Sequence, residues 1–435
     1  MMRLVNKLTI GFVLVLGTLM VTPAWGASRF PPPEFESGHE LPTTTQPGPR
    51  SETLEYLDVA VLAAALLVGA YLSLRQRSRR GIFVLVVFSL VYFGFYREGC
   101  VCSIGAIQNI TLGLFDATYA APLTVVAFFL LPLIATLLFG RSFCGGVCPL
   151  GAIQDVVLVR PIKVPRWAEE ALSVLAYAYL GSAVLFAATG SAFIICQYDP
   201  FVAFFRLSGK LSVLAIGVSL LVIGLFVGRP YCRFLCPFGV LLKWTSRLSK
   251  WRVTITPNEC IECRLCEDAC PFGAIDKPVE TERPGKQRWP KARLTLLLLL
   301  LPVLMASGGW ALSRADHTFA RMHSRVRLAE RIRAEETGLL SGTTDASDAF
   351  RTHGESPETL YAEAASLRAN FRTGGWILGA FLGLVVGGKL IRLAVFRTRI
   401  GYQADQGRCI SCGRCFAACP KEHERLKKLA DRRNT

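Results

Sequence analysis

Two short cysteine runs, about 150 residues apart, constrain this 435-residue chain more than any other feature. The first is CIECRLCEDACP, from Cys260 to Pro271, and the second is CISCGRCFAACP, from Cys409 to Pro420. Each has the spacing C-x2-C-x2-C-x3-C-P, in which three closely spaced thiolates bind one face of an iron-sulfur cube. Sites of four cysteines also bind zinc, but the same spacing found twice favours 4Fe-4S clusters.

This spacing is typical of bacterial two-cluster ferredoxins, in which the fourth cysteine of each run binds the cluster of the other run. Carried over to this chain, the ligands of the first cluster are Cys260, Cys263, Cys266 and Cys419, and those of the second are Cys409, Cys412, Cys415 and Cys270. The two runs must therefore meet on the same side of whatever separates them.

Apolar sequence separates them. Hydrophobic residues make up 52% of the chain, its mean hydropathy is +0.39, and seven apolar runs approach the roughly 20 residues that span a bilayer. These runs cover approximately 56–75, 81–96, 122–140, 169–190, 211–228, 294–312 and 373–394. We therefore predict an α-helical polytopic membrane protein with about seven transmembrane helices after a signal peptide. A small α+β bacterial-type two-cluster ferredoxin module is assembled from two separated segments.

The N-terminus has the features of a secretory signal. Arg3 and Lys7 precede an apolar stretch, which ends in Ala24-Trp25-Gly26, a small-x-small pattern that suits signal peptidase. We predict a cleaved signal peptide at 1–26, the alternative being an uncleaved first helix. The Pro-rich, polar segment 27–54 is predicted to be an extracytoplasmic linker.

The distribution of Lys and Arg predicts the topology. The predicted inner segments are rich in these residues and the short outer loops hold few, which favours a bacterial cytoplasmic (inner) membrane with the C-terminus and both cysteine runs in the cytoplasm. The net charge of +17 is then explained by topology and by attraction to anionic membrane lipid, and nucleic acid is not needed as a partner.

The predicted domains follow the spans along the chain. They are a five-helix membrane core at 55–255, the first ferredoxin half at 256–290, a transmembrane helix at 291–312, an extracytoplasmic helical loop at 313–372, a Gly-rich transmembrane helix at 373–395, and the second ferredoxin half with a basic tail at 396–435.

Four further cysteines form an internal repeat. GRSFCGGVCPLG, at 140–151, and GRPYCRFLCPFG, at 228–239, share the pattern G-R-x-aromatic-C-x3-C-P-x-G, each just past the inner end of a predicted span. The proline and glycine favour a tight turn that enters a new segment. The four thiols, Cys144, Cys148, Cys232 and Cys236, are candidates for a third metal centre, a redox-active dithiol pair, a metal relay or packed cysteines.

The remaining cysteines are predicted to lie near the outer face. Cys102-Ser-Ile-Gly-Ala-Ile-Gln partly repeats Cys148-Pro-Leu-Gly-Ala-Ile-Gln, with Cys100 two residues upstream and Cys196 on its own. An additional redox centre at Cys100, Cys102 and Cys196 has a disulfide or a structural role as its alternative.

The paired C-x3-C-P turns followed by ferredoxin runs resemble the membrane polyferredoxins of the NosR, NapH and CcoG type, most closely the membrane half of NosR. The resemblance covers roughly residues 55 to 430. NosR-like proteins carry a large extracytoplasmic flavin-binding domain before the first helices, where this chain has a short linker. The β domain with which CcoG-like proteins end has no counterpart in the basic tail.

These observations predict a membrane-bound iron-sulfur electron-transfer protein, a component of an oxidoreductase system. None of the five histidines falls in a predicted span, which excludes two-histidine haem ligation there. Electrons would pass between cytoplasmic clusters and quinone or a redox partner protein, cytoplasmic or periplasmic. The alternative is a metal-reducing assembly factor or redox sensor of the CcoG type.

Two scaffold features are also predicted. Gly375, Gly379, Gly383 and Gly387 recur every four residues along the last span, which leaves one smooth face for close helix packing. In the long outer loop, HSRVRLAERIRAEE places apolar residues among charges at helical spacing and predicts an amphipathic helix.

Overall fold

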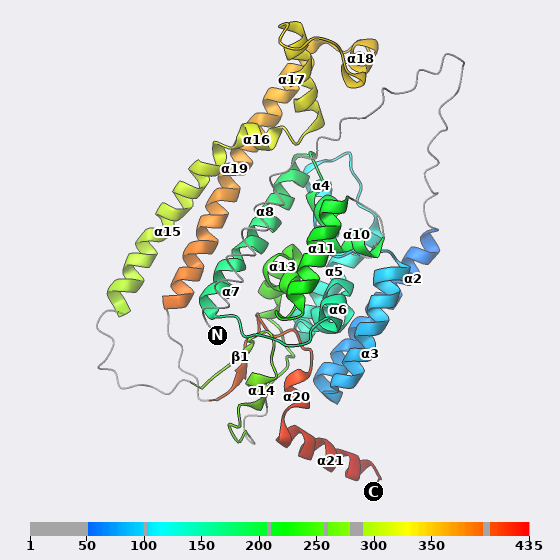
Figure 1. Cartoon of the computed structure of the whole chain (residues 1–435), viewed down its shortest axis with the longest axis vertical. Coiled ribbons are helices and arrows are strands. Elements are labelled where there is room, and N and C mark those ends of the chain that lie inside the picture. Colours follow the sequence, from blue (N-terminus) through cyan, green and yellow to red (C-terminus); the bar gives the residue numbers. More distant parts are fainter. Residues whose placement is uncertain are drawn as a thin grey trace. The chain divides into compact units, whose positions relative to one another are not determined.

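A computed structural model describes residues 51–99, 102–206, 210–255, 260–278, 290–394 and 401–434. The predicted signal peptide, nearly all of the linker, and Cys100 lie outside these residues. The described chain is mostly helical, as Figure 1 shows.

The N-terminal half forms a bundle of long and short helices. Its elements are α2 (Glu52–Tyr71), η1 (Leu72–Gln76), α3 (Arg79–Ser89), η2 (Leu90–Tyr96), α4 (Ala106–Phe115), α5 (Leu123–Phe139), η3 (Phe143–Val147), α6 (Pro149–Val156), α7 (Arg166–Leu172), α8 (Val174–Ala188), α9 (Ile194–Tyr198), α10 (Pro200–Phe205), α11 (Leu211–Gly224), α12 (Pro230–Phe234) and α13 (Pro237–Ser246). The η elements are π-helical.

The C-terminal half adds a helical hairpin and two short strands. Its elements are α14 (Leu265–Asp268), β1 (Ile275–Asp276), α15 (Pro290–Ser313), α16 (Asp316–Ala320), α17 (Ser324–Glu336), α18 (Asp345–Thr352), α19 (Pro357–Ala394), β2 (Gln403–Ala404), α20 (Arg414–Ala417) and α21 (Pro420–Asn434).

Each of the seven predicted spans coincides with helix, but the helices differ in length. Five are long and apolar enough to cross a membrane by length and composition: Glu52–Gln76, Arg79–Tyr96, Arg166–Ala188, Ala292–Ser313 and Pro357–Ala394. The runs at 122–140 and 211–228 form α5 and α11, which have 17 and 14 residues. At 1.5 Å per residue these two are about 26 and 21 Å long, short of the roughly 30 Å hydrocarbon core. That they cross the membrane therefore stays a prediction.

The helical hairpin is held by backbone contact along the predicted glycine face. A Cβ atom on Gly375 would lie 2.7 Å from the carbonyl oxygen of Leu312, and one on Gly379 would overlap the carbonyl oxygen of Gly308. Glycine is needed there because any side chain would force α15 and α19 apart. The predicted scaffold role of this face is confirmed.

The outer-loop segment is helical, as predicted, with a boundary that the sequence did not indicate. In α17, Val326 and Ile332 are buried, in agreement with the predicted amphipathic helix. However, α19 begins at Pro357, well before the predicted start at 373, because the polar stretch ahead of the apolar run continues the same helix.

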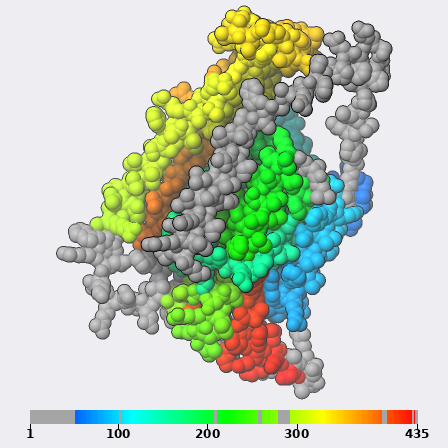
Figure 2. All heavy atoms as spheres, viewed as in Figure 1, coloured from blue at the N-terminus to red at the C-terminus, as the bar shows by residue number. Residues whose placement is uncertain are grey.

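The two ferredoxin halves come together through a small sheet. Strands β1 and β2 pair antiparallel, with Ile275 opposite Ala404 and Asp276 opposite Gln403. In Figure 2 the segments on either side of the hairpin, 260–278 and 401–434, lie against each other. Each ferredoxin half thus forms from a short local segment, and the pairing of β1 with β2 joins the two halves.

Candidate iron-sulfur sites

The backbone curls in the same way around both cysteine runs. In the first run Glu262 and Arg264 have left-handed φ angles of 54° and 64°, and the equivalent residues of the second run, Ser411 and Gly413, have φ angles of 58° and 75°. Left-handed conformations cost energy in a non-glycine residue. Successive turns of this kind form backbone concavities that suit anionic groups, including iron-sulfur clusters. The two loops thus share the shape that a cluster site requires.

The first group of thiols converges across the two runs. Cys260, Cys263, Cys266 and Cys419 line one cavity, together with Tyr402 of the segment before β2. The fourth cysteine of the second run therefore faces the three leading cysteines of the first run.

The second group shows the reciprocal arrangement. Cys270 is buried, and Cys409, Cys412 and Cys415 pack against the same small apolar core. Burial raises the pKa of the Cys409 thiol to about 12, so a positive charge or a metal must stabilise its thiolate form.

No group of three or more His, Cys, Asp or Glu side chains within the described ranges is arranged to hold a single metal ion.

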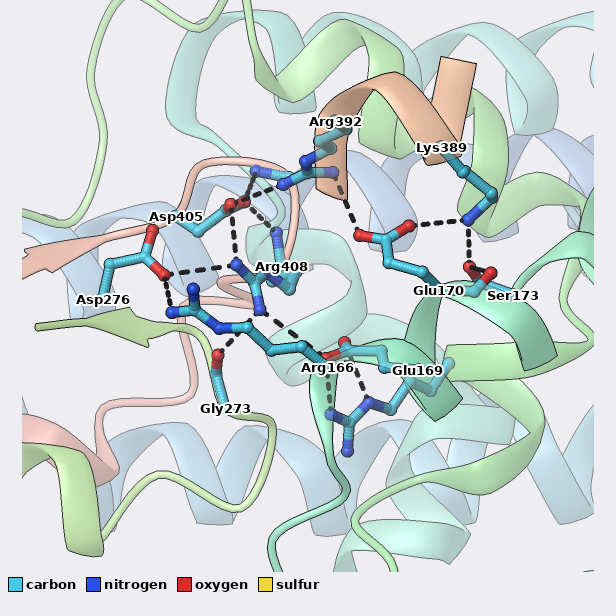
Figure 3. Close-up of polar contacts among 12 residues, drawn as sticks. Arg166, Glu169, Glu170, Ser173, Gly273, Asp276, Lys389, Arg392, Asp405 and Arg408 are labelled. Carbon is cyan, nitrogen blue, oxygen red and sulfur yellow. Dashed lines mark hydrogen bonds and ion pairs between the residues drawn. The ribbon is translucent and has the colours of Figure 1, made fainter. Parts of the chain in front are cut away.

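An ion-pair network attaches the ferredoxin unit to the helices (Figure 3). Arg408, just after β2, pairs with Asp276 of β1 at 3.2 Å and with Glu169 of α7 at 3.6 Å. Asp405 pairs with Arg392 of α19 at 2.9 Å. We call the paired segments 260–278 and 401–434 the ferredoxin unit. These ion pairs hold the ferredoxin unit against one end of α7 and α19.

The repeated C-x3-C-P turns form a third group of thiols. Cys144, Cys232 and Cys236 line one cavity, and the buried Cys148 lies within electrostatic range of Cys144 and Cys232. Cys148 and Cys236 are N-caps of α6 and α13, each followed by a proline at the first helical position. Proline is favoured there because that position needs no amide hydrogen. The repeat thus turns four cysteines inward to one place, which we call the inner site.

Two buried arginines surround the inner site with donors. Arg229 donates to the carbonyl oxygens of Cys144 and Gly145, and Arg141 Nη2 lies 3.7 Å from Cys144 Sγ. Nε of each arginine is buried without a hydrogen-bond partner among the described residues. Two buried positive charges beside the four thiols suit an anionic group bound by the thiolates. The residues therefore fit an iron-sulfur centre.

The inner site directly contacts the ferredoxin unit. A Cβ on Gly145 would overlap the carbonyl oxygen of Ile410, in the second cysteine run. Arg141 Nη1 donates to the carbonyl oxygen of Gly407 at 2.8 Å, and Cys144 packs against the apolar core that holds Cys270. Within the part of the chain that the structure describes, these contacts join the two sets of cysteines directly.

Sequence reasoning missed Asp155 of α6, the acidic residue at this junction. Its carboxylate is fully buried and pairs with Arg79 at 2.8 Å, Arg414 at 3.2 Å and Arg229 at 3.6 Å. Burial alone would raise the pKa of Asp155, but the arginines outweigh it and lower the pKa to about 2. A lone acid after a run of apolar residues was the signal available in the sequence.

The structure also brings together Cys102 and Cys196. A Cβ placed on Gly105 would lie 3.3 Å from Cys196 Sγ and 3.8 Å from Cys102 Sγ, so both sulfurs face the same small space. We call Cys102, Cys196 and the nearby Asp199 the outer group. Cys100 lies outside the described residues.

Comparison with known proteins finds 4Fe-4S binding domains over the same segments of the chain. Two family models, each described as a 4Fe-4S binding domain, match the chain. One covers 121–166 and 200–256, which contain the four inner-site cysteines. The other covers 253–276 and 402–422, the two ferredoxin halves.

Three curated relatives share parts of the chain. Protein NirI of Paracoccus denitrificans is 35% identical over 123 residues, 27% of this chain and 18% of the relative. Putative electron transport protein YccM of Escherichia coli is 29% identical over 132 residues, 28% of this chain and 37% of the relative. Uncharacterized protein MJ0750 of Methanocaldococcus jannaschii is 30% identical over 185 residues, 42% of this chain and 77% of the relative. The chain thus spans well under half the length of NirI and YccM, and no solved structure matches it.

Apolar helices of membrane-spanning length and two 4Fe-4S binding domains define the class, a membrane-type ferredoxin. The chain belongs to the membrane-type ferredoxin family that includes MJ0750, as the identity across 77% of that protein shows. The narrower resemblance to the NosR type stays a prediction.

Proposed function

We propose that this protein is a membrane-bound electron carrier whose two ferredoxin clusters exchange their fourth ligands. One cluster is held by Cys260, Cys263, Cys266 and Cys419, and the other by Cys270, Cys409, Cys412 and Cys415. The observation that carries the proposal is the position of Cys419, which lines the same cavity as the three leading cysteines of the other run. Bound at these positions, each 4Fe-4S cluster would supply a one-electron carrier.

We further propose that the inner site holds a third iron-sulfur centre. The buried guanidinium groups of Arg141 and Arg229 support this assignment, because they line the same cavity as the thiols of Cys144, Cys232 and Cys236. Positive charge near a cluster favours its reduced, more negative form. Because Gly145 contacts Ile410 in the second cysteine run, the inner site is the redox centre that exchanges electrons with the second ferredoxin cluster.

The orientation of the protein and the route of the electrons are part of the same proposal. The ferredoxin unit faces the cytoplasm, and electrons pass between it and quinone or an extracytoplasmic redox partner by way of the inner site. The hydrocarbon core is roughly 30 Å thick, too far for one electron hop, so a centre within the helices is required for a crossing.

Iron and acid-labile sulfide analysis with EPR of the anaerobically purified, reduced protein tests the cluster assignment. We expect the two ferredoxin clusters and the inner centre to contribute about twelve irons per chain if each is a cube of four. Cys419→Ser should remove the EPR signal of the cluster held by the first run, and Cys270→Ser that of the other. Stoichiometric zinc without iron would disprove the proposal. Loss of the second-run cluster in Cys419→Ser would disprove the ligand exchange.

A further inference from the structure

Three cysteines at or just before the start of a helix accept a hydrogen bond from the glycine three residues later. The N–H of Gly105 donates to Cys102 Sγ at 3.3 Å, and the N–H of Gly239 donates to Cys236 Sγ at 3.3 Å. Gly151 makes the corresponding hydrogen bond to Cys148. Cys102 of the outer group, in the turn just before α4, therefore makes the same local hydrogen bond as Cys148 and Cys236, which cap α6 and α13 in the inner site.

Two glutamines extend the copy to the opposing cysteine. Gln154 of α6 accepts the N–H of Tyr231, the residue before Cys232, at 3.0 Å. Gln108 of α4 accepts the N–H of Ile195, the residue before Cys196, at 2.9 Å. The glutamine of the partial repeat Gly-Ala-Ile-Gln thus has the same function in both places. Gln154 holds the backbone next to Cys232, and Gln108 holds the backbone next to Cys196.

The fourth position of the copy is an acid. In the inner site, Cys236 caps α13 and Pro237 follows it. In the outer group, Asp199 caps α10 and Pro200 follows it. Asp199 Oδ1 accepts hydrogen bonds from the N–H groups of Phe201 and Val202. Asp199 is almost fully buried and caps its helix three residues after Cys196, as Cys236 caps α13 four residues after Cys232. The carboxylate is an alternative anionic ligand for iron.

One hydrogen bond joins the two groups. Tyr231, which precedes Cys232, donates its hydroxyl to Asp199 Oδ2 at 2.9 Å within the buried core. Tyr179 of α8 lies within electrostatic range of Cys236 on one side and of Cys102 and Cys196 on the other. The inner site and the outer group are thus neighbours, linked by two aromatic side chains.

We propose that the outer group binds a further iron-sulfur cluster through Cys102, Cys196 and Asp199, as a copy of the inner site that carries electrons onward. In the transfer step one electron leaves the inner centre, which is oxidised, and reduces the outer cluster, with no bond made or broken. This assignment rests on the proposed function, because it gives the outer group the cofactor proposed for the inner site.

Iron counting in paired variants tests the assignment. The double variant Cys102→Ser/Cys196→Ser should contain fewer irons than the unaltered chain by one cluster, about four if the cluster is a cube, with an equal loss of labile sulfide. Both ferredoxin EPR signals should remain, which shows that the protein is folded. Ser103→Ala, in the same turn, should keep the full iron content and serves as the matched control.

The comparison variant Cys148→Ser/Cys232→Ser separates the two proposals. If it loses iron while Cys102→Ser/Cys196→Ser does not, the outer cluster is disproved and the inner centre stands. If Cys148→Ser/Cys232→Ser keeps all its iron, the inner centre of the proposed function is disproved.

A single variant gives a readout that does not depend on removing thiols. Asp199→Cys restores the inner-site ligand type, so iron should be retained and the EPR spectrum of one cluster outside the ferredoxin unit should shift. An unchanged spectrum, or a mass spectrum of the anaerobic protein that shows a Cys102–Cys196 disulfide, would overturn the assignment.

Discussion

The replacement Asp155→Asn tests how the second ferredoxin half is attached to the helices. Asp155 is fully buried and pairs with arginines from three places: Arg79 of α3, Arg414 of α20, and Arg229 at the start of α12. Asparagine keeps the shape of the side chain but removes the charge, which leaves three arginines facing one another. The pKa of Asp155 falls from 3.8 to about 2. At about 1.36 kcal/mol per pKa unit, the network favours the charged form by roughly 2.5 kcal/mol.

This free energy predicts a measurable local opening. Because every 1.4 kcal/mol is a factor of ten, the amides of 409–419 should exchange hydrogen roughly 60-fold faster in Asp155→Asn when exchange is measured by mass spectrometry. The pKa is lowered in the folded state, so the contribution is complete above pH 3.8 and is lost as the pH falls through about 2. Asp348→Asn, at an exposed pair with Arg351, is the control. Exchange within threefold of the unaltered chain at pH 7 would refute this reasoning.

Three further replacements should have graded effects. Gly145→Ala should displace the carbonyl of Ile410 and broaden the EPR signal of the second cluster, whereas Gly388→Ala, where a Cβ meets nothing within 4 Å, should not. Gly379→Ala overpacks the α15–α19 contact and should lower the thermal unfolding temperature, with a cost of roughly 1–3 kcal/mol; an unchanged temperature would contradict the close packing. Arg408→Gln should speed hydrogen exchange in 401–408 less than Asp155→Asn does in 409–419. The reason is that Asp276, Glu169 and Asp405 each keep another basic partner after Arg408 is replaced. A larger effect in Arg408→Gln would show that this ranking is wrong.

Much of the fold follows from sequence periodicity and composition. Long apolar runs predict where helices lie because burial and backbone hydrogen bonding both favour them. The predicted glycine face is present, since Gly379 leaves no room for a side chain. The bounds of α5 lie within one residue of the predicted run, whereas α11 ends at Gly224, four residues before the predicted end at 228, because the apolar sequence continues beyond the helix. Whether those two short helices span the membrane depends on surroundings that composition does not encode.

The sites divide in a similar way. Fixed spacing predicts the ferredoxin cysteines, because the three leading thiols of each run must bind one face of a cube. The contact between Gly145 and Ile410 joins residues 265 positions apart, and no local pattern announces it. Asp155 and the Tyr231–Asp199 hydrogen bond were missed for the same reason, since their partners are set by packing. The repeated Gly-Ala-Ile-Gln was visible in the sequence, but it did not show that the glutamine side chain accepts a hydrogen bond from a backbone N–H.

Electron transfer across a sealed membrane tests the central claim most directly. The purified protein is placed in quinone-free vesicles, the ferredoxin side is reduced photochemically, and reduction of an impermeant acceptor on the opposite side is followed. The account predicts transfer that is abolished when Cys144, Cys148, Cys232 and Cys236 are replaced by serine while both ferredoxin EPR signals remain. Transfer at an unchanged rate in that variant would remove the inner site from the route, and transfer only after quinone is added would place the crossing on the lipid-soluble carrier. Absence of transfer with or without quinone would contradict the proposed electron carrier.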